Sequence, residues 1–333
     1  MEGILVTGGA GYVGSHTVNR LHRQGFHCIV LDNLVHGHRE FIKRGVELIE
    51  GDLSDSSLLK EVFSSNRIAA VMHFSAYAYV GESVTDPLKY YENNVGSTIR
   101  LLRCMLEAGV SRLIFSSTCA TYGNPLHLPI TEEHPQNPVN PYGATKVMVE
   151  RILRDFGEAY GLKSVVFRYF NAAGADPGAE IGEWHEPETH LIPLVLEVAS
   201  GERQIVQIHG ADYPTSDGTC VRDYIHVCDL ADAHILGLSY LLSGGDSDFF
   251  NLGNGSGFSV KEVIEAVTRV SQCSVRHAYG PRRPGDPPIL VGSSEKARRV
   301  LGWNPQFPEL EEILRTAWLW QQKLKQMRRL KST

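Results

Sequence analysis

The sequence has few of the features that would place a protein in a membrane, outside a cell or around a metal ion. None of its 333 residues belongs to a run that approaches the roughly 18 consecutive apolar residues of a membrane span. Its six cysteines are scattered, without a C-x-x-C pair or a His/Cys spacing suited to zinc. The first residues lack a basic segment followed by a long apolar one, so no export signal is expected. We predict a cytoplasmic protein with reduced thiols, no membrane contact and no metal.

An excess of positive charge is also missing. The chain has 32 lysines and arginines against 38 aspartates and glutamates, a formal net charge of -6. Such a chain has no overall field that attracts nucleic acid or an anionic membrane, and we expect no nucleic-acid partner. Any anionic ligand must therefore be held by local groups. The length, at roughly 100–200 residues per domain, predicts about two domains.

The first half of the chain does contain a regular alternation of strand and helix patterns. The predicted strands span 4–7, 27–31, 46–50, 69–74, 112–115 and 164–170, and the predicted helices span 12–24, 54–65, 87–108 and 142–160. The strand segments are almost continuously apolar, as expected where helices cover both faces of a sheet. The pattern predicts an α/β fold with a doubly wound parallel sheet of the Rossmann type.

The texture of the chain changes after Asn171. Residues 174–188 are rich in glycine, proline and acidic side chains, and the elements that follow are shorter and less regular. Residues 223–242 again have the pattern of a strand that leads into a helix. We predict a first, dinucleotide-binding domain over 1–172 with a return segment near 221–249, and a smaller substrate domain over most of 173–333.

A glycine-rich turn joins the first predicted strand to the first helix, with glycines at 8, 11 and 14. Glycine allows the tight turn and the close approach of the backbone to a pyrophosphate, which then faces the helix N-terminus. Asp32 ends the second strand and can accept hydrogen bonds from both hydroxyls of an adenine ribose. Because its carboxylate would repel a 2′-phosphate, NAD is favoured over NADP. Asp52, after the third strand, is a second candidate for an adenine contact.

Tyr142 and Lys146 lie four residues apart at the start of a predicted helix, so both project from one face. The fifth strand ends in Ser116-Ser117-Thr118 and delivers hydroxyls to the sheet edge where open α/β folds bind ligands. Removing a proton from a sugar hydroxyl needs a base near neutral pH, whereas free tyrosine has a pKa of about 10. A positive charge about 4 Å away contributes roughly 4 kcal/mol at an effective dielectric of about 20. We therefore expect Lys146, aided by a cationic nicotinamide, to lower the pKa of Tyr142 to about 7.

These motifs resemble those of the extended short-chain dehydrogenase/reductase family, and the likeness covers nearly the whole chain. Further segments carry it: Val80-Gly81-Glu82-Ser83, Tyr90-Tyr91-Glu92-Asn93-Asn94, Arg168-Tyr169-Phe170-Asn171, Gly218-Thr219-Cys220-Val221-Arg222-Asp223-Tyr224-Ile225-His226-Val227 and Arg282-Arg283-Pro284-Gly285-Asp286. Within the family, the chain is similar to isomerases that interconvert UDP-glucose and UDP-galactose. The resemblance implies a tightly held NAD that takes a hydride from C4 and returns it to the other face of the rotated 4-keto sugar.

The resemblance also implies the roles of individual residues. Tyr142 would remove the 4-hydroxyl proton, Thr118 would orient the 4-oxygen, and Lys146 would also bind the nicotinamide ribose. Cofactor contacts are implied at Gly8, Gly11, Tyr12, Val13, Gly14, Asp32, Asn33, Asp52, Leu53, Phe74, Ser75, Asn93, Ser116, Tyr142, Lys146 and Tyr169. Contacts with the UDP-sugar are implied at Thr118, Tyr142, Asn171, His190, Leu191, Arg222, Arg283 and Asp286. The predicted helices over 87–108 and 142–160 resemble those of the family's intersubunit bundle, which implies a homodimer.

Several positions leave the sugar open. Residues 79–83 and 116–123 are also similar to UDP-xylose/UDP-arabinose 4-epimerases, whereas 182–190 is similar to bacterial hexose epimerases. Leu290 stands where a small residue admits N-acetylhexosamines, so its bulk argues against them. Ala78 replaces a lysine of many members and removes one contact with the pyrophosphate.

Two other functions compete with epimerisation. An NAD-dependent nucleotide-sugar 4,6-dehydratase of the same fold would need an Asp-Glu pair directly after Thr118, where this chain has Cys119-Ala120. A non-catalytic dinucleotide-binding regulator would have no reason to keep Thr118, Tyr142 and Lys146 together.

The segment from His185 to His190 superficially resembles a zinc-protease motif. Its histidines are five residues apart rather than four, and Pro187 breaks the helix that such a motif needs. We interpret the segment as a loop of the substrate domain, with His190 near the uridine.

Overall fold

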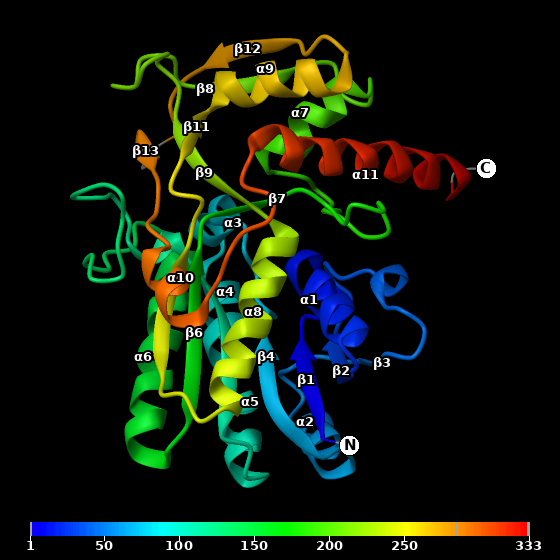
Figure 1. The fold of residues 1–333 in the computed structure, drawn as a ribbon, viewed down its shortest axis with the longest axis vertical. Helices are drawn as coiled ribbons and strands as arrows, with labels where there is room; N and C mark the ends of the chain where they lie inside the picture. Colours follow the sequence, from blue (N-terminus) through cyan, green and yellow to red (C-terminus); the bar gives the residue numbers. More distant parts are fainter. Residues whose placement is uncertain (1, 284–285, 332–333) are drawn as a thin grey trace.

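The computed structural model describes residues 2–283 and 286–331, so Pro284 and Gly285 of the 282–286 motif lie outside the described residues. Its centre is a seven-stranded parallel sheet with the strand order β10-β6-β5-β4-β1-β2-β3. The strands are β1 (Gly3–Thr7), β2 (His27–Asp32), β3 (Glu47–Glu50), β4 (Ile68–His73), β5 (Arg112–Thr118), β6 (Lys163–Tyr169) and β10 (Asp248–Leu252). Helices cover both faces of the sheet (Figure 1), which confirms the predicted doubly wound parallel fold.

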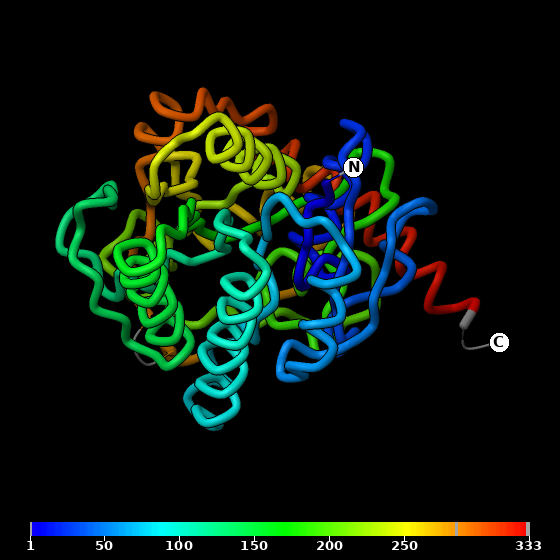
Figure 2. Tube along the Cα trace, turned by 90° about the horizontal axis from the view of Figure 1, so that it is seen from below, coloured from blue at the N-terminus to red at the C-terminus, as the bar shows by residue number. Residues whose placement is uncertain are grey.

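Alternate residues of β1 pack against helices on opposite faces of the sheet. Ile4 and Val6 share an apolar cluster with α1 and α8, whereas Leu5 belongs to a cluster with α2, α5 and α6. Figure 2 shows α5 and α6 on one side of the sheet and α8 on the other. Both faces of the sheet are therefore shielded from water, which explains why the strand sequences are continuously apolar and do not alternate with polar residues. The helices are α1 (Tyr12–Arg23), α2 (Ser56–Ser65), α5 (Ser97–Glu107), α6 (Pro141–Tyr160) and α8 (Val227–Leu242).

The helix predicted over 87–108 is present and runs without a break from Pro87 to Glu107, but it contains a π-helical turn. It consists of α4 (Pro87–Tyr90), a π-helical turn over Tyr91–Gly96 and α5, and it follows the short helix α3 (Val80–Thr85). In the π-helical turn, the Asn94 side chain accepts a hydrogen bond from the Tyr77 amide and donates one to the Tyr77 carbonyl. It also donates to the Thr145 hydroxyl of α6 at 3.1 Å. The prediction of one long helix is therefore confirmed, whereas apolar spacing carries no information about the π-helical turn and its tertiary contact.

A second region lies beyond the carboxyl ends of the large sheet (Figure 1). Its α7, α9 and α11 surround an apolar core of their own, and α10 packs back onto β10. None of the helices in residues 2–283 and 286–331 combines the length and the apolarity that crossing a bilayer requires. The elements are β7 (Asn171–Ala173), α7 (Leu191–Ala199), β8 (Val206–His209), β9 (Val221–His226), β11 (Gly257–Ser259), α9 (Val260–Ser271), β12 (His277–Gly280), β13 (Ile289–Leu290), α10 (Glu295–Leu301) and α11 (Leu310–Lys331).

The chain returns to the large sheet through α8 and β10. Of the predicted return segment near 221–249, β9 pairs instead with β7, β11 and β13 in a smaller sheet, and β10 continues to Leu252. A third sheet joins β8 and β12. The division into two domains near residue 172 stays a prediction. The large sheet and the smaller sheets meet near the same point of the chain, since β6 ends at Tyr169 and β7 begins at Asn171.

Candidate active site and cofactor pocket

The glycine turn between β1 and α1 is too tight for side chains at two of its three glycines. Gly8 has a φ of +71°, and a Cβ there would lie 2.6 Å from the Ser75 nitrogen. A Cβ on Gly14 would lie 2.2 Å from the Gly8 carbonyl oxygen, whereas at Gly11 the nearest atom would be 3.4 Å away. The backbone thus folds closely on itself and leaves the N-terminus of α1, which begins at Tyr12, facing the sheet edge.

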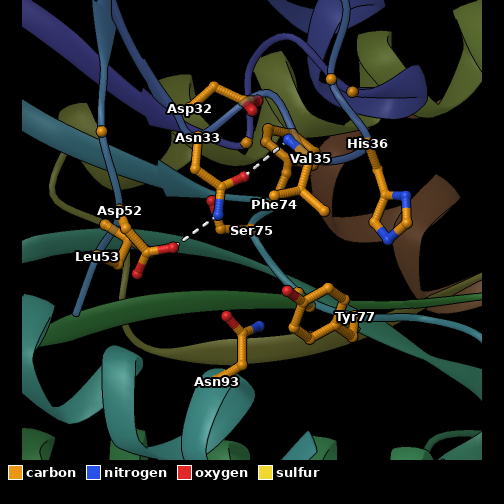
Figure 3. Close-up of a pocket in the computed structure, with 15 residues that line it drawn as sticks. Asp32, Asn33, Val35, His36, Asp52, Leu53, Phe74, Ser75, Tyr77 and Asn93 are labelled. Atoms are coloured by element: carbon orange, nitrogen blue, oxygen red, sulfur yellow. Dashed lines mark hydrogen bonds between the residues drawn. The ribbon is translucent and has the colours of Figure 1, made fainter. Parts of the chain in front are cut away.

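This turn lies where the strand order reverses, between β1 and its neighbour β4. Open α/β sheets bind ligands in the crevice at such a point, outside the carboxyl ends of the strands. A pocket opens there (Figure 3), and its walls include nine of the predicted cofactor residues. These are Gly8, Gly11, Asp32, Asn33, Asp52, Leu53, Phe74, Ser75 and Asn93.

Asp32 ends β2 inside this pocket and is 6% exposed. Its two carboxylate oxygens accept the backbone amides of Ala10 and Leu34, each at 2.9 Å. Burial raises the pKa of Asp32, and the two amides oppose the rise. Each oxygen keeps a lone pair for a further donor such as a ribose hydroxyl. Beside it, the Asn33 amide donates to Asp52 at 2.6 Å (Figure 3), which holds both side chains at the pocket wall.

Part of the pocket wall was not indicated by any sequence pattern. His36 packs edge-on against Tyr77 and Tyr79, with ring centroids 5.7 Å and 5.2 Å apart. Its Nε2 atom is buried and has no hydrogen-bond partner within the described residues. An orphaned polar atom beside a glycine turn fits a polar ligand such as a dinucleotide. Only the location of these residues just beyond β2, β3 and β4 could have indicated them: Val35, His36, Gly37, Gly51, Ala76 and Tyr77.

The other predicted cofactor residues lie outside this pocket. The Tyr12 hydroxyl donates to the Gly174 carbonyl at 2.6 Å, and Val13 packs against the core. The hydroxyls of Ser116 and Tyr169, on the adjacent strands β5 and β6, share a hydrogen bond of 2.6 Å. The structure therefore divides the predicted cofactor residues between the crevice at β1 and β4 and a second group at β5 and β6.

Thr118, Tyr142 and Lys146 come together in this second group. Asn140 caps α6 by accepting the Gly143 amide at 2.8 Å, which sets the start of the helix that carries Tyr142 and Lys146. The Nζ of Lys146 donates to the Ser116 carbonyl of β5 at 2.8 Å and lies 5.9 Å from the Tyr142 ring centroid. Thr118 ends β5 and is buried, as is Lys146.

Burial shifts the pKa values of both Tyr142 and Lys146. Burial raises the pKa of Tyr142 well above its ordinary value, the charge of Tyr169 adds to the rise, and the Thr118 hydroxyl opposes it. Burial also lowers the pKa of Lys146 to about 7. In the chain without a cofactor, desolvation is the largest cause of both shifts, so the expectation that Lys146 and a cationic nicotinamide together bring the pKa of Tyr142 to about 7 stays a prediction.

A buried ion pair holds α6 against the two strands. Glu150, one turn beyond Lys146, accepts from Ser117 of β5 at 2.5 Å and from Arg168 of β6 at 2.6 Å. The side chains of Glu150 and Arg168 are 7% and 3% exposed. Removing one partner of such a pair costs about 3–5 kcal/mol, so it fixes the register of α6 on the sheet. The sequence shows Glu150 only as one more helical carboxylate.

Apart from Thr118 and Tyr142, the predicted substrate residues lie in the second region, and two of them are bonded to each other. Arg222 of β9 forms an ion pair with Asp286, and its side chain is 13% exposed. The Asn171 amide donates to the Asp223 carbonyl at 2.9 Å. Arg283 is exposed. Of these two arginines, Arg222 is thus the one that a carboxylate orients.

His190 and Leu191 form the entrance to α7. Leu191 is its first residue, and His190 Nδ1 lies 2.5 Å from a carboxylate oxygen of Glu183. Burial lowers the pKa of His190, but the charge of Glu183 outweighs it and raises the pKa. The same holds for His185, whose pKa rises to about 10 because Glu183 and Glu188 outweigh its burial. The segment before α7 contains no helix, as predicted.

Comparison with known proteins agrees with this geometry. A family model described as the NAD dependent epimerase/dehydratase family matches residues 4–253. A curated UDP-glucose 4-epimerase of Halalkalibacterium halodurans is 54% identical over 317 residues, which are 95% of this chain and 95% of that protein. The UDP-glucose 4-epimerase of Brucella ovis, crystallised in complex with NAD, is 47% identical with a TM-score of 0.93, over 96% of this chain and 98% of that one. The enzyme of Bifidobacterium longum, crystallised with NAD+ and UDP, is 39% identical with a TM-score of 0.92, over 96% and 98%.

Proposed function

The chain belongs to the NAD dependent epimerase/dehydratase family, and we propose that it interconverts UDP-glucose and UDP-galactose by transient oxidation at C4 of the sugar. It is an isomerase, and its cofactor is NAD. The observation that carries the residue assignment is the meeting of Thr118, Tyr142 and Lys146 at the end of β5, beside the crevice. The dehydratase reading is not favoured, because Cys119-Ala120 cannot supply the acid and base that water elimination needs.

The large sheet would bind the cofactor and the second region the UDP-sugar. The N-terminus of α1 behind Gly8 and Gly14 would face the pyrophosphate, and Asp32 would accept the hydroxyls of the adenine ribose. The buried Nε2 of His36 would gain a polar partner in the same pocket. Lys146 would bind the nicotinamide ribose. When bound, NAD supplies the hydride acceptor for C4 and a positive charge that lowers the pKa of Tyr142.

The proton would be handled by Tyr142. Its Oη takes the proton of the 4-hydroxyl as C4 is oxidised and returns it when C4 is reduced, while the Thr118 hydroxyl holds the same oxygen. Lys146, with a pKa lowered to about 7 by burial, is protonated in part at neutral pH and favours the phenolate form of Tyr142 when charged. Burial of the pair excludes water, so the attraction is stronger than it would be at the surface.

The UDP group would be held apart from the reacting sugar. Arg222 and Arg283 suit the diphosphate through charge-assisted hydrogen bonds, and Asp286 orients the Arg222 guanidinium. Asn171, His190 and Leu191 would complete the contacts with the nucleotide side. Binding energy placed on UDP rather than on the sugar leaves the 4-keto ring free to rotate, which inversion requires.

The assembly and location of the protein are further parts of this proposal. Exposed apolar side chains on α3 to α6 fit an interface between two copies, among them Val84, Leu88, Ile99 and Met148. Static light scattering at micromolar concentration should give twice the chain mass of 36.9 kDa, and a monomeric mass would contradict the dimer. The six cysteines are free, which fits a cytoplasmic location that cell fractionation can test.

The decisive test of the activity offers UDP-galactose to the purified protein without added NAD and follows inversion at C4 by NMR. Parallel samples contain UDP-xylose and UDP-N-acetylgalactosamine. We expect UDP-galactose to reach equilibrium with UDP-glucose, because the cofactor is retained through turnover. Inversion of UDP-xylose alone would overturn the hexose assignment, and a 4-keto-6-deoxy product would overturn epimerisation itself.

A further inference from the structure

Four side chains of the loop before α7 converge on one point. Glu183, His185, Glu188 and His190 each direct one potential ligand atom inward, and these four atoms all lie within 4.8 Å of one another. They come from eight successive positions of a non-helical segment, so the convergence is a property of the loop's fold and not of helical spacing. We call these four residues the Glu/His quartet.

The spacing within the Glu/His quartet is that of a metal-ligand set. In a tetrahedral site with bonds of about 2.0–2.1 Å, neighbouring ligand atoms are roughly 3.3–3.4 Å apart. Nδ1 of His185 lies 3.4 Å from Glu183 and 3.6 Å from Glu188, and Nδ1 of His190 lies 3.7 Å from Glu188. The remaining short contact, between His190 and Glu183, is a hydrogen bond of 2.5 Å. An ion at the centre would need shifts of only a few tenths of an ångström at most of these contacts.

The polar groups of the quartet also lack a complete set of partners. Nδ1 of His185 is buried and has no hydrogen-bond partner within residues 2–283 and 286–331. The carboxylates of Glu183 and Glu188 are only 7% and 6% exposed. In the described part of the chain, their ion-pair partners are His185 and His190 alone. Two backbone amides, those of Thr189 and His190, already donate to Glu188. Because buried polar atoms are nearly always satisfied, the unpartnered Nδ1 of His185 fits a further group bound among these atoms.

We propose that the Glu/His quartet binds one divalent transition-metal ion of the zinc class. Two imidazole nitrogens and two carboxylate oxygens form a ligand set that zinc accepts in four-coordinate geometry. Four protein ligands close the coordination sphere, so the ion would be structural and would take no part in the proposed epimerisation. The spacing of five and Pro187 do exclude a helical zinc-protease motif, but they do not exclude a site built by a loop.

Such an ion would stiffen the substrate side of the active site. His190 immediately precedes α7, and the first residue of that helix, Leu191, is among the proposed substrate contacts. The ring of His185 lies edge-on to Tyr12, the first residue of α1, with centroids 6.3 Å apart. The ion would thus fix the conformation of a loop that lies between the starts of α1 and α7.

Metal analysis of the full chain with its NAD tests the proposal directly. The protein, freed of any purification tag, is treated with EDTA, dialysed and titrated with Zn²⁺. We expect about one zinc per chain by mass spectrometry and a rise in Tm of roughly 2–5 °C at saturating zinc. Absence of zinc binding by this wild-type protein would overturn the proposal.

Cobalt substitution identifies the ligands, because the free cysteines could also bind zinc. The Co²⁺ form of a four-coordinate N/O site should show visible d–d absorption without a thiolate charge-transfer band. A thiolate band would place the ion on cysteine and overturn the assignment. This measurement uses the wild-type chain, so it stays decisive if a variant fails to fold.

A pair of matched variants locates the site within the loop. Glu188→Gln removes one ligand charge while keeping the side-chain shape, and we expect zinc affinity to fall by at least about 100-fold. Glu186→Gln is the control, since Glu186 lies in the same loop but its side chain is 69% exposed and outside the quartet. Equal affinity in the two variants would contradict the proposal. Metal content is measured without turnover. A negative result would therefore contradict the metal site without contradicting the proposed epimerisation.

Discussion

The cofactor side and the substrate side of the active site are assembled in different ways. On the cofactor side, Gly8, Asp32, Asp52, Ser75 and Thr118 each end one of the strands β1 to β5 or lie within two residues of its end. These strands are parallel and adjacent in one sheet, so residues far apart in the sequence meet under a single structural rule. A polar residue at the end of an apolar run is therefore informative wherever it occurs on this side.

The substrate side follows no such rule. Arg222 lies within β9, Asp286 on a loop before the short strand β13 that pairs with β9, and His190 in front of α7. The functional side chains are held by individual pairs, Arg222 with Asp286 and His190 with Glu183. The Glu/His quartet belongs to the same region. The comparison teaches that site residues can be predicted from the sequence where regular strands position them. Residues that are brought together by side-chain pairing cannot be predicted from strand and helix patterns.

The largest effect is expected where the two sides meet, at the proposed base. Tyr142→Phe removes the only hydroxyl proposed to take the 4-hydroxyl proton, so kcat should fall by about 10²–10⁴-fold while UDP binding is kept. Tyr160→Phe is the matched control, because Tyr160 ends the same helix and is 61% exposed. Turnover like that of the wild type in Tyr142→Phe would remove Tyr142 as the base.

A substitution on the substrate side should weaken binding of the nucleotide sugar without affecting the cofactor. Arg222→Ala deletes a charge-assisted contact with the diphosphate, and KM for UDP-galactose should rise by about 10- to 100-fold. The NAD content of the purified protein should not change. Arg269→Ala serves as control, since Arg269 pairs with Glu311 at the surface with its side chain 59% exposed. A loss of NAD in Arg222→Ala would show that the two sides are not separable.

A single added methyl group should disturb the close backbone packing of the glycine turn on the cofactor side. Gly14→Ala places a Cβ 2.2 Å from the Gly8 carbonyl, and the free energy of unfolding should fall by about 1–3 kcal/mol in urea titrations. Retained NAD, measured by absorbance after denaturation, should fall as well. At Gly81 a Cβ meets nothing within 4 Å, so Gly81→Ala should change neither quantity. Full NAD retention in Gly14→Ala would contradict a pyrophosphate site at this turn.

The smallest effect concerns a buried histidine beneath the cofactor side. Burial lowers the pKa of His234 from 6.5 to about 4, and its ring packs against Phe74 and Phe167. Because the folded-state pKa is depressed, the stabilisation is complete above pH 6.5 and is lost as the pH falls towards 4.

His234→Phe should therefore reduce the pH dependence of stability. Between pH 6 and pH 5, the wild type should lose up to about 1.4 kcal/mol per pH unit more than the variant does in urea unfolding. If the free energy of unfolding changed equally with pH in the two proteins, His234 would not remain neutral in the folded chain.

Much of the cofactor side could be predicted from the sequence, and particular residues show why the remainder could not. Gly8, Gly11 and Asp32 line the pocket as expected, because a strand end and a tight turn are local properties. His36 escaped notice because nothing in a loop sequence shows that a ring nitrogen is buried without a partner. The π-helical turn at Tyr91–Gly96 depends on Asn94 bonding to Tyr77 and Thr145, which are remote in the sequence.

The sequence by itself determined the parallel sheet, the glycine turn and the pairing of Tyr142 with Lys146 on one helix face. Each of these follows from local backbone preference or from apolar periodicity, which act over a few residues. Only the tertiary structure decided the pKa values of Tyr142 and Lys146, the Glu150–Arg168 pair and the convergence of Glu183, His185, Glu188 and His190. Burial and close approach of charges depend on which segments pack together, and that is a property of the whole folded chain.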